Sequence, residues 1–332
     1  MKQRVLKALS LVLVLVLAGA TIIGCSSQPA HPASSNDTNT PAQTPVTIKV
    51  GTLQTDDILP LWVAVDKGLL KDQGLDVQIT TFQSAQEQVA AMTAGKIDAM
   101  MTDMIVPVQL NASGTPVKAV TVCQTAPAGI IAGKGSGITQ ISQLAGVPTG
   151  CASPTAMEYI YDKALTDAGV PAAQIKTTEI KKIPVRLQML GAGQLKAAVL
   201  PWTLFTMAQQ QGGVPLLDQQ KAASLTSTVL VFSQTFLDTP DANSALARLL
   251  TQYNKAVADI NANPDSFRTL LIKEAKLPAA IADTYPVRQY PQAGLPDQAQ
   301  FESVVSWMQE KGYIKASQSY ADLTYKVDLS AQ

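Results

Sequence analysis

The chain has 332 residues, and its 25 basic side chains balance 25 acidic ones, so the formal net charge is zero. This balance argues against a nucleic-acid partner, which requires a basic surface. The single histidine, His31, lies near the amino terminus, so the sequence from Val46 onward offers no imidazole for general base catalysis or for metal binding. We therefore expect no catalytic activity, no cofactor and no metal site.

The first 24 residues have the pattern of a secretory signal peptide. Three basic residues precede an almost wholly apolar stretch over 8–23, and Gly24 follows. The apolar stretch is too short and wrongly flanked for a stable membrane span. Removal of this segment would leave 22 basic and 25 acidic side chains.

Cys25 comes directly after this segment. The run Ile22-Ile23-Gly24-Cys25 resembles a bacterial lipobox, and the resemblance implies cleavage before Cys25 with lipid on its thiol and on the new amino terminus. Two or more acyl chains anchor a protein stably in a membrane. We expect a lipid anchor on the extracytoplasmic face of the cell membrane, in a periplasm or at a cell surface. An ordinary secretory signal with an incidental cysteine is the alternative.

Residues 25–45 are predicted to form a flexible tether. The segment after Cys25 is composed of small and polar residues with no large apolar side chain before Val46. Such a segment cannot bury enough surface to offset its ordering entropy. As a flexible coil, it would have an end-to-end distance of about 25 Å.

From Val46 onward, short strand patterns alternate with helix patterns, which indicates an α/β body with parallel strand pairs. Pro60 stands at a helix start, where its missing N–H is harmless, and Ser84 is placed to cap the next helix. Strands are expected at 46–50, 75–79, 97–101 and 117–122, with helices over 60–68 and 85–94.

An internal similarity suggests a second lobe built from the same unit. Residues 94–99 resemble residues 192–197, and in both places a helix ends at glycine and an apolar strand follows. We expect the chain to return to the first lobe through a strand at 228–232 and to be helical in pattern over 242–308. The predicted bounds are 46–126 and 226–332 for lobe one and 127–225 for lobe two. Cys123 and Cys151 could pair or could be two buried thiols.

The opening of this body resembles the nitrate/sulfonate/taurine-type solute-binding proteins of ABC importers, whose superfamily includes binding proteins for thiamine-precursor pyrimidines. Residues 49–51, 59–64 and above all 67–77 carry the resemblance, and 94–99 and 141–146 match two further segments. The resemblance implies a type II periplasmic-binding fold, a ligand between two lobes and an importer permease as partner. The chain departs from the family at Lys196, where the second glycine turn usually continues with an acidic residue.

In open α/β sheets, ligands bind beyond the carboxyl ends of the strands. Ser84, Ser153 and Thr155 could instead only cap helices, and Trp62 could belong to the core. Asp103 could cap a helix or accept a ligand N–H. The predicted ligand-binding residues are Gln54, Thr55, Asp56, Trp62, Ser84, Ala85, Thr102, Asp103, Ser153, Thr155, Trp202 and Thr203.

The charges of these loops bear on the ligand. Helix N-termini suit an anion, whereas Asp56, Asp57 and Asp103 would repel one. Arg186 is the nearest cation of lobe two and could equally face solvent, and Trp202 offers a flat surface for stacking. We therefore favour a small heterocycle such as a pyrimidine over a sulfonate- or nitrate-like anion. We expect a monomeric solute-binding protein that serves an ABC importer, or alternatively a lipoprotein that presents its ligand to a membrane receptor.

Overall fold

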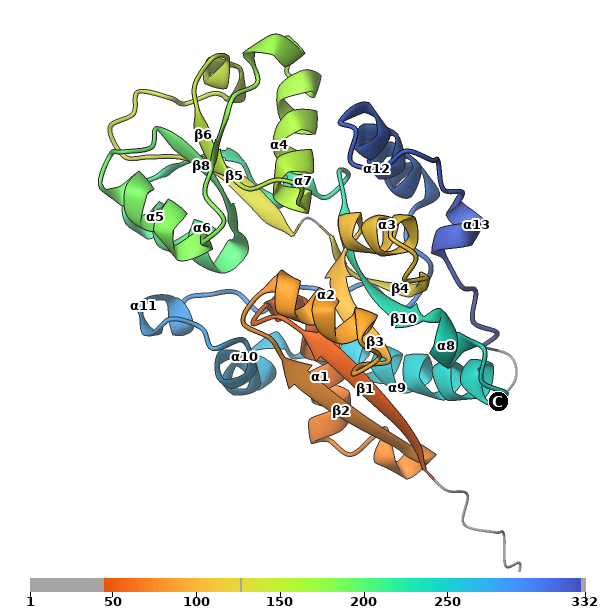
Figure 1. The fold of residues 1–332 in the computed structure, drawn as a ribbon. Helices are drawn as coiled ribbons and strands as arrows, with labels where there is room; N and C mark the ends of the chain where they lie inside the picture. The colour runs from red at the N-terminus through yellow and green to blue at the C-terminus, as the bar shows by residue number, and fades with distance from the viewer. Residues whose placement is uncertain (1–44, 126, 330–332) are drawn as a thin grey trace, which may run out of the picture. The chain divides into compact units, whose positions relative to one another are not determined.

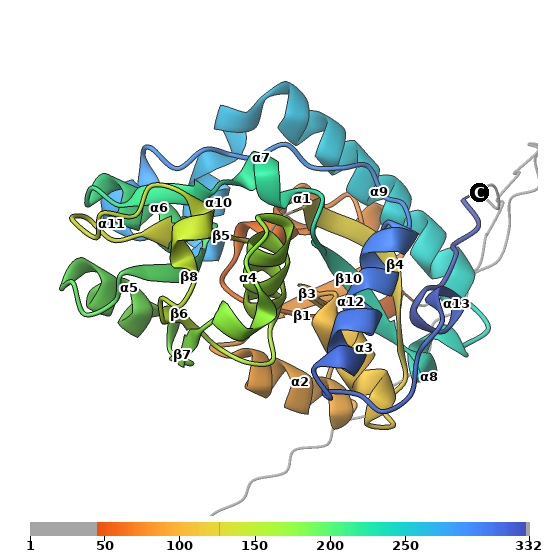
Figure 2. The ribbon, with the colours of Figure 1, turned by 90° about the horizontal axis from the view of Figure 1, so that it is seen from above.

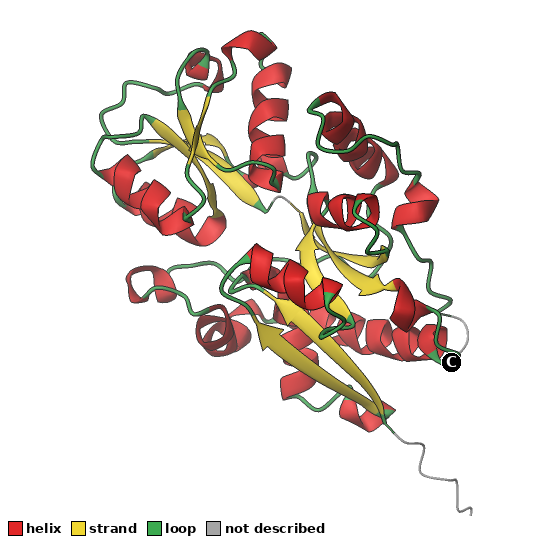
Figure 3. Cartoon of the chain, viewed as in Figure 1, coloured by secondary structure: helices red, strands yellow, loops and turns green. Residues whose placement is uncertain are grey.

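The computed structural model describes residues 45–125 and 127–329. The predicted signal peptide, the lipidation site Cys25 and nearly all of the tether lie outside these residues. Within the described ranges, none of the helices is both long enough and apolar enough to cross a membrane. Strands form the centre of each of two lobes and helices flank them (Figure 3).

The first sheet has five strands in the order β2-β1-β3-β10-β4. β1 pairs in parallel with β2 and β3, and β10 pairs antiparallel with β3 and β4. The predicted strands are confirmed, except that the third begins at Ala99 because a turn occupies the preceding residues. The strands are β1 (Val46–Thr52), β2 (Leu75–Thr81), β3 (Ala99–Asp103), β4 (Val117–Thr125) and β10 (Ser227–Ser233).

The two faces of this sheet belong to different apolar clusters, as the alternation along a strand requires. Leu230 and Phe232 pack with α1 (Leu59–Asp66) and α9 (Ala242–Ala262), whereas Val229 and Val231 pack on the opposite face. α9 is seen beside α1 in Figure 1. The helices of the opposite face are α2 (Ala85–Thr93), α3 (Ile105–Ala112) and α12 (Gln298–Glu310).

The second sheet also has five strands, in the order β7-β6-β8-β5-β9. β6 pairs in parallel with β7 and β8, and β5 is antiparallel to β8 and contacts the edge strand β9. Its strands are β5 (Ala128–Ala132), β6 (Thr149–Cys151), β7 (Thr177–Glu179), β8 (Ala197–Pro201) and β9 (Val214–Leu217), and its main helices are α4 (Ala156–Asp167), α5 (Ile183–Gly191) and α6 (Trp202–Gln210).

The internal similarity noted in the sequence corresponds to one repeated turn. α2 leads into β3 through Gly95, and α5 leads into β8 through Gly193. Both glycines have a left-handed backbone, with φ values of 64° and 71°. Residues with a Cβ adopt this conformation at a cost, which explains why glycine ends both helices.

The expected helical region 242–308 is helical at both ends but not throughout. α9 and α12 are confirmed, whereas residues 283–297 contain no helix. Pro286, Pro291 and Pro296 recur through this stretch, and proline removes the N–H that a continuing helix needs. The remaining helices are α7 (Gln219–Ala222), α8 (Gln234–Leu237), α10 (Arg268–Ala275), α11 (Ala279–Ala282) and α13 (Tyr320–Leu323), with 3₁₀ turns at Asp56–Ile58, Lys71–Gln73, Ile141–Leu144, Ala172–Gln174 and Pro264–Phe267.

Candidate ligand-binding site

Most predicted site residues follow the carboxyl end of a strand, as the α/β arrangement requires. Gln54 to Asp56 follow β1, Ser84 and Ala85 follow β2, and Thr102 and Asp103 end β3. In the second lobe, Ser153 and Thr155 follow β6, and Trp202 and Thr203 begin α6 after β8. Contact of any of them with a ligand stays a prediction.

Asp56 forms a buried polar cluster with the irregular segment before α12. Its Oδ2 atom accepts a hydrogen bond from Tyr285 Oη at 2.9 Å and lies 3.6 Å from Arg288 Nη1. The Asp56 backbone carbonyl accepts a hydrogen bond from Tyr290 Oη at 2.7 Å. The side chains of Asp56 and Arg288 are 9% and 4% exposed, so the ion pair is held away from water.

Arg288 also contacts the second lobe. Its guanidinium lies over the Trp202 ring, 5.9 Å from the centroid. With the Gln219 amide oriented to satisfy its partners, the amide oxygen accepts from Arg288 Nε at 3.0 Å and from Nη2 at 3.2 Å. A single guanidinium therefore joins the loop after β1 to the start of α6 and of α7.

The electrostatics of this cluster favour a charged Arg288. Burial acts to lower the pKa of Arg288, but the negative charge of Asp56 and the nearby tyrosines hold it above the ordinary value. Burial raises the pKa of Asp57, against the opposing effect of a 2.5 Å hydrogen bond from Thr55 Oγ1. The sequence-based argument placed few cations at the strand ends, and it missed Arg288.

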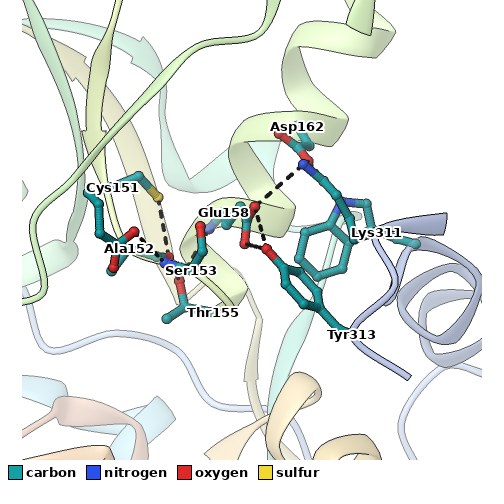
Figure 4. A network of polar contacts seen from close by, with 10 residues as sticks. Cys151, Ala152, Ser153, Thr155, Glu158, Asp162, Lys311 and Tyr313 are labelled. Atoms are coloured by element: carbon teal, nitrogen blue, oxygen red, sulfur yellow. Dashed lines mark hydrogen bonds and ion pairs between the residues drawn. The ribbon is translucent and has the colours of Figure 1, made fainter. Parts of the chain in front are cut away.

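The loop before α4 is held by a dense set of hydrogen bonds (Figure 4). Thr155 Oγ1 donates to the Ala152 carbonyl at 2.6 Å and accepts from the Glu158 N–H at 3.3 Å, so Thr155 is a helix cap. The Ser153 N–H donates to Glu179 Oε2 at 3.0 Å. The loop is thus bonded to the first turn of α4 and to β7.

Asp103 is the last residue of β3 in the first lobe. Its Oδ1 atom accepts from the N–H groups of Ile105 at 2.8 Å and Val106 at 3.3 Å, so it caps α3. Burial raises the pKa of Asp103, although hydrogen bonds from the N–H groups of Ile105, Val106 and Ala156 act to lower it. Ala156 is the first residue of α4, so the pKa of this carboxyl group responds to a group of the second lobe.

Four side chains next to this loop form a second polar cluster. Tyr313 Oη donates to Glu158 Oε2 at 2.9 Å, and Lys311 Nζ lies 3.4 Å from Glu158 Oε1 and 2.7 Å from Asp162 Oδ2 (Figure 4). The carboxylates come from α4, and Lys311 and Tyr313 follow α12. None of these four residues was among the predicted site residues.

Other predicted residues have structural roles in this structure. Trp62 is 5% exposed and packs in the core beneath the first sheet. Ser84 caps α2 by accepting from the Glu87 N–H at 3.2 Å.

The solvent-facing alternative for Arg186 is wrong. Its side chain is 1% exposed and donates to the carbonyls of Ile180 at 2.7 Å and Val199 at 3.0 Å. Burial lowers its pKa, and these carbonyls give it a structural role inside the second lobe.

Cys123 and Cys151 are free and buried. Cys123 lies in β4 of the first sheet and Cys151 in β6 of the second, which explains why they do not pair. Burial raises the pKa of Cys151 to about 12 and raises that of Cys123 still further. Both thiols therefore stay protonated near neutral pH and are poor nucleophiles.

Two surface cavities, of about 490 and 540 Å³, lie on the second lobe. The first is lined by α5, α6 and the turn at Gly133–Lys134, and the second by residues around β9 and Thr139–Ser142. None of the predicted site residues lines either cavity. We place the candidate site at the strand ends, where charged and aromatic groups of both lobes meet.

Solved structures share this fold. The periplasmic aliphatic sulphonate binding protein SsuA from Escherichia coli is 17% identical, with a TM-score of 0.74 over 86% of this chain and 93% of that one. The periplasmic nitrate-binding protein NrtA from Synechocystis PCC 6803 is 16% identical, with a TM-score of 0.65 over 82% and 83%. The predicted two-lobe periplasmic-binding fold is confirmed.

The sequence relatives lead to one family. Two 4-amino-5-hydroxymethyl-2-methylpyrimidine phosphate synthases of Saccharomyces cerevisiae are 34% identical over 83 residues, which span 25% of this chain and 24% of theirs. The family model described as "NMT1/THI5 like" matches residues 55–267, more than half of the chain. The chain therefore belongs to the NMT1/THI5-like family.

Proposed function

We propose that this protein is a lipid-anchored, extracytoplasmic solute-binding protein that captures a small organic molecule for an ABC importer. The observation that carries the proposal is the position of Arg288, which links Asp56 after β1 to Trp202 after β8. Charged and aromatic groups of both lobes thus meet where α/β folds bind ligands. We also propose that it acts as a monomer, with lobe one at 46–126 and 226–332 and lobe two at 127–225.

A binding role fits the chain better than catalysis. Cys123 and Cys151 are buried thiols with raised pKa values, and the sequence after His31 has no histidine to activate a nucleophile. The yeast relatives, whose match spans a quarter of this chain, are enzymes by name. The test therefore also measures whether the protein converts an aminopyrimidine.

Two ligand classes are proposed. A heterocycle such as a pyrimidine could stack on Trp202 and donate a hydrogen bond to Asp103 or Asp56. A sulfonate- or nitrate-like anion could use the N-terminus of α4 and the positive charge of Arg288. The names of the yeast relatives point to the first class and those of the structural neighbours to the second.

The test is native mass spectrometry of the purified protein followed by calorimetry. The calorimetric panel holds 4-amino-5-hydroxymethyl-2-methylpyrimidine, hexanesulfonate, taurine and nitrate. We expect one class to bind and to be recovered unchanged. Absence of both a carried-over molecule and binding across the panel would contradict solute binding, and chemical conversion of the pyrimidine would favour an enzyme.

Asp103→Asn separates the two ligand classes. Loss of the carboxylate should weaken a heterocycle that donates to it by about tenfold, because a hydrogen bond to a charged acceptor is stronger than one to a neutral acceptor. The same change should leave an anion unaffected or bound more tightly. Tight binding of hexanesulfonate or nitrate that Asp103→Asn leaves intact would replace the heterocycle with the anion.

The lipid anchor has its own test. Cells that express the full chain are fed a fatty-acid analogue, and wild type is compared with Cys25→Ala. We expect label on the wild type alone and an uncleaved precursor for the variant. Label on Cys25→Ala would contradict the anchor while leaving solute binding untouched.

A further inference from the structure

The first two turns of α4 are attached to the chain segment that follows α12. Glu158 and Asp162 lie one helical turn apart on α4 and are 4% and 7% exposed. Lys311 Nζ lies within 4 Å of both carboxylates, at 3.4 and 2.7 Å. Trp307 Nε1 donates to Asp162 Oδ2 at 2.9 Å, so both carboxylates are satisfied by groups from the end of the chain.

Apolar contacts accompany these polar ones. The rings of Tyr159 and Trp307 meet edge to face with centroids 5.3 Å apart, and Tyr159 Oη donates to Ser303 Oγ at 2.9 Å. Ala156 and Tyr159 belong to the same buried cluster as α3 and α12. Figure 2 shows α4 beside α12. The start of α4 therefore packs on α3 and α12 of the first lobe.

The negative charges of Glu158 and Asp162 make this attachment depend on Lys311. Among the described residues, Lys311 makes every ion pair recorded for Glu158 and Asp162. A buried carboxylate that loses its only cation is strongly disfavoured. If Lys311 were removed, the carboxylates of Glu158 and Asp162 would be favoured only in contact with solvent. The first turns of α4 would then have to shift to expose them.

Tyr313 connects this attachment to the loop before α4. Its hydroxyl donates to both carboxylate oxygens of Glu158, at 3.0 and 2.9 Å. Glu158 is in turn bonded through its N–H to Thr155. The Tyr313 hydroxyl group is therefore linked to the loop through Glu158, the residue whose N–H donates to Thr155.

We propose that Tyr313 and Lys311 are positioning residues of the ligand site, which hold the loop Ala152–Thr155 and the N-terminus of α4 in a ligand-binding arrangement. The role in binding rests on the proposed function, whereas the effect on the loop does not. Neither residue need touch the ligand.

Hydrogen exchange tests the effect on the loop without any ligand. Tyr313→Phe removes the hydroxyl and keeps the ring, whose centroid lies 5.6 Å from that of Trp307. The matched control is Tyr320→Phe, because Tyr320 packs on Phe301 of the same helix and its hydroxyl donates to the Pro296 carbonyl. We expect amide exchange at Glu158 and Tyr159, whose N–H groups donate to Thr155, to accelerate about tenfold in Tyr313→Phe only.

A purely structural role predicts a different result. It would lower the melting temperature of Tyr313→Phe and leave exchange at Glu158 and Tyr159 equal to that of Tyr320→Phe, and this outcome would overturn the proposal. Lys311→Met should show the same faster exchange. Lys311→Arg keeps the charge, so its exchange rates should stay within about twofold of wild type. Equal exchange in Lys311→Met and wild type would also overturn it.

Calorimetry with two named probes, hexanesulfonate and 4-amino-5-hydroxymethyl-2-methylpyrimidine, tests the effect on binding. For whichever probe binds wild type, Tyr313→Phe should weaken affinity about tenfold and Tyr320→Phe should not. Unchanged affinity in Tyr313→Phe would overturn the positioning role. If wild type carries no molecule and binds neither these probes nor taurine nor nitrate, the proposed function fails, and the exchange data alone decide the link between Tyr313 and the loop.

Discussion

The guanidinium of Arg288 lies 3.6 Å from the carboxylate of Asp56, and both side chains are buried. Removing two charges from water is costly, and a buried pair is tolerated only when further hydrogen bonds satisfy it. Tyr285 donates to the carboxylate and Gln219 accepts from the guanidinium. This pair fixes the irregular segment before α12 against the end of β1.

Arg288→Met should destabilise the protein by about 3–5 kcal/mol, because it leaves the buried carboxylate of Asp56 without its cation. Urea unfolding at neutral pH measures the change in the free energy of unfolding. The double variant Arg288→Met with Asp56→Asn should recover most of the loss, since no unpaired charge then remains. A double variant as unstable as the single one would show that the ion pair is not the cause.

Trp202→Ala should weaken ligand binding by about tenfold or more, since a stacking aromatic contributes roughly 1 kcal/mol beyond its buried area. Trp202→Phe keeps a flat ring and should retain most of the affinity. Calorimetry with the panel ligand that binds best provides the measurement. Equal loss in both variants would indicate that the indole acts through its packing on Phe205, 5.0 Å away between centroids, and not through stacking on the ligand.

Gly129→Ala should destabilise the fold by about 1–3 kcal/mol, the usual cost of overpacking a core. A Cβ atom at Gly129 would lie 2.7 Å from the Leu217 carbonyl oxygen and 2.7 Å from Trp202 Cζ3. Gly294→Ala is the control, because a Cβ there meets nothing within 4 Å. Thermal unfolding of the two variants should differ clearly, and similar melting temperatures would contradict the close approach at Gly129.

The attachment made by Lys311 should fail at alkaline pH. Burial acts to lower the pKa of Lys311, but Asp162 and Glu158 hold it above the ordinary 10.5. A lysine whose pKa is raised by folding stabilises the fold below its unfolded pKa and loses that contribution as pH rises through the folded value. The stability difference between wild type and Lys311→Met should therefore be constant from pH 7 to 9 and shrink above about 10.5. A difference independent of pH would assign the effect to packing.

The local sequence was enough to predict much of the fold. Alternating apolar residues predict β1 and β2, Ser84 predicts the start of α2, and Gly95 and Gly193 predict two similar turns. Each of these signals depends on residues a few positions apart, so it can be read without knowing the tertiary structure.

The sequence also placed candidate residues at strand ends, because that edge follows from the order of strands and helices. It did not predict Arg288, Lys311 or Tyr313, which lie outside regular helices and strands. The pattern around Arg288, with tyrosines and prolines at 285–291, carried no signal that identifies a distant partner. It also left open a solvent-facing Arg186, which is buried.

Helices and strands were predictable from the sequence and side-chain partners were not, for a physical reason. A helix or strand is selected by interactions along a short stretch of chain, whereas the partner of a charged side chain is selected by the position of elements that are far apart in sequence. The sequence by itself determined the two α/β lobes and predicted a candidate site at the strand ends. Only the tertiary structure decided that Asp56 would be neutralised by Arg288 and that Glu158 would be held by Lys311 and Tyr313.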